Sequence, residues 1–362
     1  MKVLDRYILR ELIGPLFFGL AAFTGMFAGV ELVQAVRTAV DYGAPIGSAL
    51  HLIALRLPQI VVWTVPMAML LAALLAMGRL SGTGEIIAMK AAAVSFYRIA
   101  APVAAMGLGL SMLTVAVGEW VVPAANLEYR RVLVEDVQGG QLPTVTRNVI
   151  LKEYQGGFLR GILYASEYDV AERAMRDVTV VELDGRRPVR TTYARRVVWE
   201  KNTWWMEDGV IHIHGGEPGV TVDFRQGRQP VTIGYRPEQV VAAQKNPEEM
   251  TIRELREQIA FLESRGADTR TYALNLHLKL SIPAASFLFA FLAAPLGVRP
   301  HRSAASVGFG LSMVIIIVYY VLMTLGTAMA QSGTVPPAMG AWLPDGVLAA
   351  AGAGLWASAG RR

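Results

Sequence analysis

The residues best suited to act on another molecule lie in a short basic stretch, residues 79–98, between two long apolar runs. Its central part, residues 83–94, is expected to form a short amphipathic helix. Such a helix can lie on a membrane surface or insert into a groove of a partner protein. It would offer that partner one acid, Glu85, and one base, Lys90. We therefore interpret this segment as a coupling helix.

The start of this helix follows from local sequence rules. Gly82 and Gly84 interrupt the preceding helix, and Thr83 is a suitable cap for the next one. Glu85 then lies in the first turn, where a negative charge interacts favourably with the helix dipole. The alternative role for Glu85 is this dipole interaction alone, which contributes less than about 1 kcal/mol.

Motifs for enzymatic chemistry are missing from the sequence. It contains no Gly-Lys pair and hence no Walker A phosphate-binding loop, and it lacks Gly-x-Ser-x-Gly and His-Glu-x-x-His. The absence of cysteine excludes disulfides and thiolate chemistry. We expect a non-enzymatic chain without a cofactor of its own, so any ATP must be bound with its magnesium and hydrolysed by a partner subunit.

Three further polar residues have both a functional and a simpler interpretation. His212 and His214 fall on one face of a predicted strand and have the chemistry of metal ligands, but no third ligand is in view, which favours ordinary strand histidines. Glu119 could serve a proton relay; at the end of an apolar run, hydration or a salt bridge is the simpler explanation.

Basic residues at the ends of apolar runs are candidates for binding lipid headgroups. Arg37 and Arg56 fall on the expected outer side, and arginine can bind a phosphate through two parallel hydrogen bonds. Interfacial anchoring is the alternative for both. Asn275, His277 and Lys279 could likewise contact a substrate, or form an interfacial polar belt with a snorkelling lysine.

Composition and hydropathy predict a polytopic α-helical membrane protein. The chain has 362 residues, of which 53% are hydrophobic and 17% charged, and its mean hydropathy is +0.39. Runs of about 20 apolar residues can cross a bilayer. Six expected spans meet this criterion, three before and three after a polar region: residues 12–34, 52–77, 99–122, 272–297, 304–329 and 338–357.

The distribution of charge orients the chain. The segments 1–10, 78–98, 298–304 and 361–362 together hold ten Lys or Arg and two acids, whereas residues 124–270 hold 21 Lys or Arg and 22 Asp or Glu. Short basic loops remain cytoplasmic, so both termini are expected inside. No nucleic-acid partner is needed to explain the net charge of +5. The first apolar run lacks a small-residue cleavage site and is expected to be retained as a span.

The polar region reads as an all-β domain inserted between spans 3 and 4. Alternating apolar residues separated by Gly- and Asp-rich turns predict several short strands and a sandwich or roll. The expected strands are 145–154, 158–164, 177–183, 189–199, 204–214, 220–224 and 231–235. The predicted organisation is therefore a first helical part (1–123), a β domain (124–246), and a linker helix with the last spans (247–362).

Four pieces of sequence resemble the lipopolysaccharide-export permease family of the LptF/LptG type, also called YjgP/YjgQ. They are Leu-Asp-Arg-Tyr-Ile-Leu-Arg-Glu at 4–11, the run from Pro66 to Glu85, Gly-Glu-Trp-Val-Val-Pro at 118–123 and Arg-Thr-Tyr-Ala-Leu-Asn at 270–275. Their order and spacing cover nearly the whole chain. The Gly118-Glu-Trp piece is more similar to G-type members.

This resemblance implies a permease subunit of an ABC transporter in the bacterial inner membrane. Six transmembrane helices would flank a periplasmic β-jellyroll, two permeases would pair as a homo- or heterodimer, and a cytoplasmic ATPase dimer would drive them. Lipopolysaccharide, or a related anionic glycolipid, would be extracted from the outer leaflet. It would then pass through the β domain to periplasmic bridge proteins with jellyroll domains.

The resemblance also implies roles for particular residues. The ATPase-coupling set is Arg79, Glu85, Ile86, Met89 and Lys90; the headgroup set is Arg37, Arg56 and Lys279; and the gate set on spans 1 and 5 is Phe27, Val30, Leu311 and Ile315. One departure concerns the outer end of span 1, where family members often carry a basic residue and this chain has Glu31. Either Arg37 replaces that residue or the substrate has a different charge pattern.

Two other classes of function are weighed against export. A non-transporting membrane adaptor would relay ATPase motion to a periplasmic partner, and would purify with that partner but without lipid. A lipid-modifying enzyme is disfavoured because the sequence has no catalytic constellation.

Overall fold

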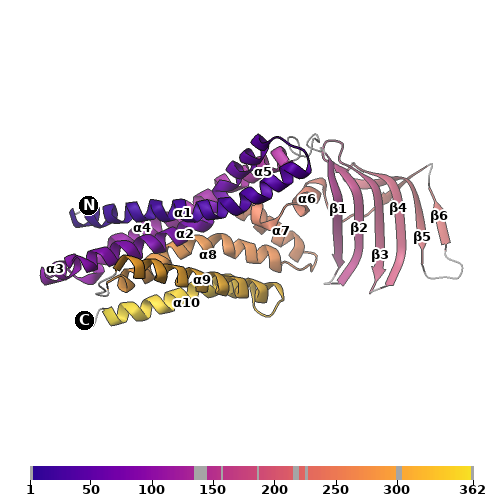
Figure 1. Ribbon diagram of the computed structural model, residues 1–362. Helices are drawn as coiled ribbons and strands as arrows, with labels where there is room; N and C mark the ends of the chain where they lie inside the picture. Colours follow the sequence, from indigo (N-terminus) through magenta and orange to yellow (C-terminus); the bar gives the residue numbers. More distant parts are fainter. Residues whose placement is uncertain are drawn as a thin grey trace. The chain divides into compact units, whose positions relative to one another are not determined.

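The computed structural model consists of two compact units, a helical unit (Met1–Gln138 and Arg270–Arg362) and a sheet unit (Gly139–Thr269) (Figure 1). It describes residues 3–133, 145–155, 158–185, 187–214, 220–224, 227–298 and 304–359. Five basic residues used above to orient the chain lie outside this part: Lys2, Arg299, Arg302, Arg361 and Arg362.

The helical unit is built from long helices joined by short turns. Its elements are α1 (Val3–Asp41), α2 (Ile46–Gly82), α3 (Glu85–Ala91), α4 (Phe96–Ala116), the π-helix η1 (Val117–Val121), α5 (Val122–Val132), α8 (Arg270–Leu296), α9 (Ala304–Gln331) and α10 (Pro337–Ala359). The expected lead-in before residue 12 is simply the start of α1. Its predicted apolar stripe is confirmed, since Ile8 and Leu12 are fully buried.

Within the described residues, five helical segments are long and apolar enough to cross a membrane. They correspond to the first five expected spans. The sixth, 338–357, corresponds to α10, which does not belong to these five. Pro344, Asp345 and many alanines and glycines keep the hydropathy of α10 low.

The helix α2 is the centre of this unit, and α1, α4, α8 and α9 all pack on it. In α2, 83% of the apolar window is buried, against 11% in α1 and 17% in α9. Helices α1 and α9 therefore lie at the periphery and expose most of their apolar side chains. In a membrane, such surfaces face lipid or another transmembrane protein.

Small residues and polar contacts join the helices locally. A Cβ at Gly19 would lie 3.2 Å from Ala68 Cα, so the absence of a side chain permits the close approach of α1 to α2. The expectation that Gly14, Gly25 and Gly29 serve the same purpose is wrong, because an added Cβ would meet no atom within 4 Å at these positions.

Three hydrogen bonds connect side chains of different helices. Thr24 and Thr64 share one of 2.9 Å between α1 and α2, and Tyr320 Oη donates to the Trp63 carbonyl at 3.2 Å between α9 and α2. Tyr319 Oη donates to Asp345 Oδ1 at 3.4 Å between α9 and α10.

The predicted helix end at Pro123 is wrong. The chain widens into η1 and continues as α5, with the proline in its first turn. The Val122 N–H donates to the Val117 carbonyl in the π pattern, so the next donor to Gly118 would be residue 123, which is proline and has no N–H. Lys279 Nζ donates to the Gly118 carbonyl instead, at 3.0 Å.

The sheet unit contains one antiparallel sheet in which consecutive strands pair. Its elements are β1 (Val145–Gln155), β2 (Phe158–Asp169), β3 (Ala174–Asp184), β4 (Arg187–Glu200), β5 (Thr203–Ile213), β6 (Val220–Asp223) and β7 (Arg228–Val231), followed by α6 (Pro237–Ala243), the 3₁₀ turn Pro247–Glu249 and α7 (Ile252–Glu263). The order is β1-β2-β3-β4-β5-β6, and β7 also pairs with β5. β6 pairs with residues 210–213 and β7 with residues 204–207.

The strand expected at 231–235 is shifted, because β7 ends at Val231. The next residues, 233–235, are held by bonds to strands at both ends of the sheet order. The buried Trp204 Nε1 of β5 donates to the Tyr235 carbonyl at 2.7 Å, while Tyr235 Oη donates to the Lys152 carbonyl of β1 at 2.8 Å. A run of isolated apolar residues in this segment thus contributes core residues rather than a strand.

The helix α7 begins with the predicted capping box. Thr251 Oγ1 accepts from the Glu254 N–H, and the Glu254 carboxylate accepts from the Thr251 N–H. Lys245 Nζ lies 2.6 Å from Glu254 Oε1. Although burial opposes ionisation of this carboxyl, the bonds from Lys245 and Thr251 hold the pKa of Glu254 below its ordinary value.

Replacing Lys279 tests the proline-dependent contact. Lys279→Met removes the donor to Gly118 and should lower the free energy of unfolding by about 1–3 kcal/mol, since it leaves a carbonyl without this bond. In a Pro123→Ala background the residue-123 N–H is restored, and the same change should cost less. Thermal unfolding of the four full-length variants in detergent measures this; equal costs in both backgrounds would contradict the assignment.

Acidic pH should loosen α7. A carboxyl with a lowered native pKa stabilises fully above its ordinary pKa, and this contribution disappears as the pH falls through the native value. Hydrogen-exchange protection of residues 252–263 in the full-length protein should therefore fall below about pH 4. In Glu254→Gln, protection at neutral pH should already be reduced and depend less on pH; an unchanged profile would contradict this account.

Candidate functional site

The short helix α3 is set by two glycines, but its cap differs from the prediction. Gly84 is the N-cap residue and has φ of +78°, a left-handed conformation that glycine adopts without strain. The expected cap, Thr83, instead closes α2: its Oγ1 donates to the Arg79 carbonyl at 3.1 Å. Glu85 lies in the first turn, as predicted.

Both carboxylate oxygens of Glu85 have partners within the chain. Thr83 Oγ1 donates to Oε1 at 2.9 Å, and Tyr7 Oη of α1 donates to Oε2 at 2.7 Å. Glu85 is thus oriented by the first helix. An ionised carboxylate offers about four lone-pair sites, so capacity remains for a further donor. No sequence pattern indicated Tyr7, which is 78 residues away.

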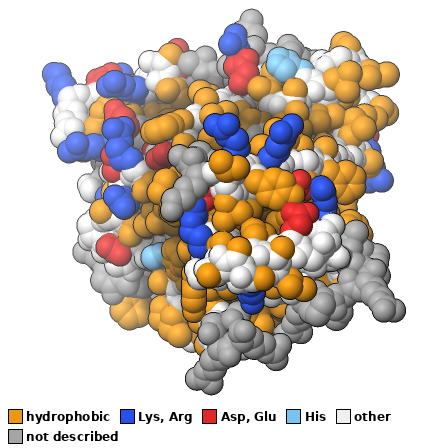
Figure 2. Space-filling model, turned by 90° about the vertical axis from the view of Figure 1, so that its left-hand side faces the viewer, with side chains coloured by type: hydrophobic (Ala, Val, Ile, Leu, Met, Phe, Trp, Pro, Cys, Tyr) orange, Lys and Arg blue, Asp and Glu red, His pale blue; other side chains and the backbone are white. Residues whose placement is uncertain are grey.

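The bond from Tyr7 is one of three polar contacts between the beginning of α1 and the segment 79–98. We call them the N-terminal contact cluster: Asp5 Oδ1 with Arg98 Nη1 at 2.6 Å, Tyr7 Oη with Glu85 Oε2 at 2.7 Å, and Glu11 Oε2 with Arg79 Nη1 at 2.5 Å. Figure 2 views this end of the helical unit, where basic and acidic side chains lie among apolar ones.

The side chains of α3 point in two directions. Ile86 is 1% exposed and Met89 packs on the same core, so both anchor α3 to the helices of its own chain. Ile87 is 66% exposed and Lys90 is also exposed, with Nζ 5.9 Å from the Phe96 ring centroid. The outward face therefore carries an acid, a base and an apolar side chain, and Ile87 was not among the predicted site residues.

The three expected headgroup residues have different surroundings. Arg37 is exposed on α1. The Arg56 guanidinium lies over the Tyr129 ring, with Cζ 4.3 Å from its centroid, a cation–π contact between α2 and α5. Lys279, as described above, donates to Gly118. Only Arg37 is fully on the surface of this chain.

The four expected gate residues lie on the peripheral helices. On α1, Val30 is exposed and Phe27 packs partly against the core. On α9, Leu311 and Ile315 are also packed partly against it. The outermost apolar side chains of α9 are instead Val314, Ile317, Val318, Val321 and Leu325.

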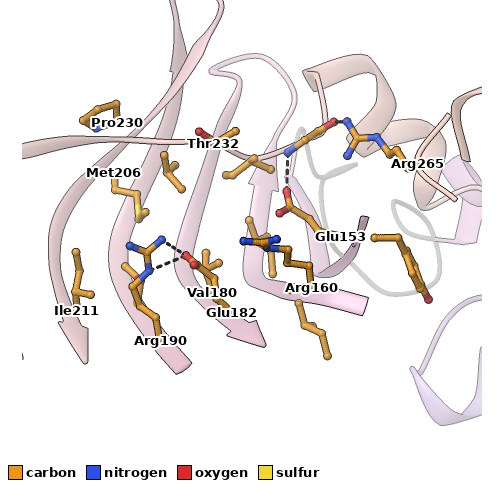
Figure 3. Close-up of a pocket in the computed structure, with 18 of the residues that line it drawn as sticks. Glu153, Arg160, Val180, Glu182, Arg190, Met206, Ile211, Pro230, Thr232 and Arg265 are labelled. Carbon is orange, nitrogen blue, oxygen red and sulfur yellow. Dashed lines mark hydrogen bonds and ion pairs between the residues drawn. The ribbon is translucent and has the colours of Figure 1, made fainter. Parts of the chain in front are cut away.

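The sheet unit contains a cavity of about 900 Å³ on the inner face of its strands (Figure 3). Its apolar wall comes from Leu163, Val180, Met206 and Ile211 on four neighbouring strands. Apolar side chains alternate along each strand, which is why one face supplies this wall. The dimensions and lining suit an elongated apolar ligand.

Charged groups line other parts of the same cavity. Arg190 is ion-paired with Glu182 across β4 and β3. Glu153 Oε1 accepts from the Gly234 N–H at 2.6 Å, and the Gly234 carbonyl accepts from Arg265 (Figure 3). An apolar wall bordered by paired charges is the arrangement expected for an amphipathic ligand.

The weaker candidates are placed as follows. His212 Nδ1 and His214 Nε2 share hydrogen bonds with Thr221 and Thr191, and among the described residues no group of three or more His, Asp or Glu could hold a metal ion. Asn275 Nδ2 donates to the Thr271 carbonyl of its own helix.

Comparison with known proteins places the whole chain among membrane permeases. The profile of the family described as lipopolysaccharide export system permease LptF/LptG matches residues 6–358. The chain is 24% identical over 357 residues to the lipopolysaccharide export system permease protein LptG of Haemophilus influenzae, covering 95% of both chains. It is 26% identical over 381 residues to the protein of the same name from Escherichia coli K12, covering 95% of this chain and 94% of that protein.

Proposed function

Because this chain belongs to the LptF/LptG family of lipopolysaccharide export permeases, we propose that it is the permease subunit of an ABC transporter. It extracts lipopolysaccharide or a related anionic glycolipid from the outer leaflet of the inner membrane. The observation that carries the coupling part of this proposal is the oriented Glu85 carboxylate on the outward face of α3. ATP and magnesium are bound by the partner ATPase, not by this chain.

The helix α3 is the contact for that ATPase. Burial of Ile86 and Met89 anchors it, while Glu85, Ile87 and Lys90 remain available to a groove of the partner. Arg79, at the last turn of α2, contributes through its ion pair with Glu11. A small surface of mixed charge and one apolar side chain is suited to docking in a groove.

In this proposal six helices cross the membrane, with α10 as the sixth, and both termini and α3 are cytoplasmic. The basic residues of the short loops support this orientation. The low hydropathy of α10 does not prevent insertion, because its neighbours α8 and α9 cover part of its surface.

The exposed apolar faces of α1 and α9 bound the lipid-binding cavity of a permease dimer, formed with a homologue or a second copy. Phe27 and Val30 lie on the first face, and Leu311 and Ile315 on the second. Arg37 and Arg56 bind headgroup phosphates, since guanidinium groups pair well with them. Lys279 contributes charge to the same region while its Nζ is bonded to Gly118.

The sheet unit is the periplasmic, jellyroll-like part of the export route. Its cavity receives acyl chains along the wall formed by Leu163, Val180, Met206 and Ile211. From there the lipid passes to periplasmic bridge proteins with similar domains.

Removing the Glu85 carboxylate tests the coupling role. Glu85→Ala should weaken co-purification of the ATPase by about tenfold or more, as expected when one partner of an interfacial charge pair is lost. Glu128→Ala, which removes an exposed acid paired with Arg131 on α5, is the matched control. Undiminished ATPase binding and lipid release in Glu85→Ala would exclude this role.

A charge on the cavity wall tests the lipid route. Val180→Glu should lower lipid release by about tenfold or more while ATP hydrolysis by the complex continues, because an unpaired carboxylate is costly beside acyl chains. Thr179→Glu places the same group on the opposite face of β3 and should release lipid normally. Equal release by both variants and the unmodified protein would contradict passage through this cavity.

A further inference from the structure

The beginning of α1 and the coupling segment are joined by two kinds of contact. The N-terminal contact cluster provides polar contacts from residues 5, 7 and 11, which occupy the first turns of α1. Beside them, Ile8 and Leu12 are fully buried in the same core as Ile86 of α3. Separating α3 from α1 would therefore break charged contacts and expose apolar side chains at once.

Beyond this region α1 is held less extensively. Only 11% of its apolar window is buried, and its described contacts with α2 include the close approach at Gly19 and the bond from Thr24 to Thr64. Phe17, Phe18, Met26 and Val30 are exposed. A helix attached firmly at one end and exposed along its length can shift as a body on its neighbour.

We propose that the N-terminal contact cluster makes α3 and α1 a single moving element. A displacement of α3 by an ATPase is thereby transmitted directly to the exposed apolar face of α1, without passing through the core of the helical unit. This inference rests on the proposed coupling function and adds the path of transmission. Tyr7 is the positioning residue of the path, because its hydroxyl fixes the orientation of Glu85.

Reciprocal charge reversal tests this path without touching the surface assigned to the ATPase. Asp5→Arg and Arg98→Asp each place two like charges together, and the double variant restores an opposite pair. All are prepared as the full complex of permeases and ATPase, reconstituted in vesicles containing lipopolysaccharide. The readouts are ATPase co-purification, ATP hydrolysis, its stimulation by lipopolysaccharide and lipid release to a periplasmic acceptor.

Each single reversal should reduce lipid release and lipid-stimulated hydrolysis by at least about threefold, with ATPase binding and basal hydrolysis unchanged. The double variant should return to near the unmodified level. Tyr7→Phe, which removes only the hydroxyl, should act in the same direction as the single reversals. Thermal unfolding of each variant identifies a misfolded chain, and the restored double variant keeps the test decisive if a single variant unfolds.

Lipid release at the unmodified rate in both single reversals would overturn the proposal. So would failure of the double variant to restore release, or loss of ATPase binding together with release, since the cluster would then support only folding or docking. Failure of the coupling function itself is recognised separately, by unchanged ATPase binding in Glu85→Ala.

Discussion

The helical unit depends on how closely its helices fit around α2. Lipid chains are as apolar as leucine, so burial from water does not hold helices together within a bilayer, and close packing must do so. The residues between Pro66 and Met77 are small or flexible and are almost all buried. This fixes α2 as the frame on which four other helices pack. It also fixes the position of α3, which follows α2 after a two-residue turn.

Much of the fold could be predicted because local rules determine it. Continuous apolar runs gave the first five long helices, and alternation gave the strands, with ends in error by several residues. The capping box at Thr251 and the place of Glu85 in the first turn of its helix depend only on neighbouring residues. The α3 segment was therefore located correctly, even though Gly84 rather than Thr83 begins it.

The contacts that give this segment its properties could not be predicted, because they join distant parts of the chain. Nothing near Glu85 indicates a bond from Tyr7, and nothing near Ile86 shows which face of so short a helix is buried. Pro123 was misjudged for the same reason. A proline normally ends a helix, yet here a π-type widening and a lysine from α8 allow the helix to continue.

The last strands of the sheet have a consequence for its solubility. β5 is covered along its outer side by two short strands, β6 and β7, each pairing with only four of its residues. Neither is long enough to serve as a template for an incoming strand of ordinary length. Uncontrolled growth into aggregates is therefore blocked at this border by geometry rather than by charge, and a newly synthesised chain is protected there as soon as the two short strands have formed.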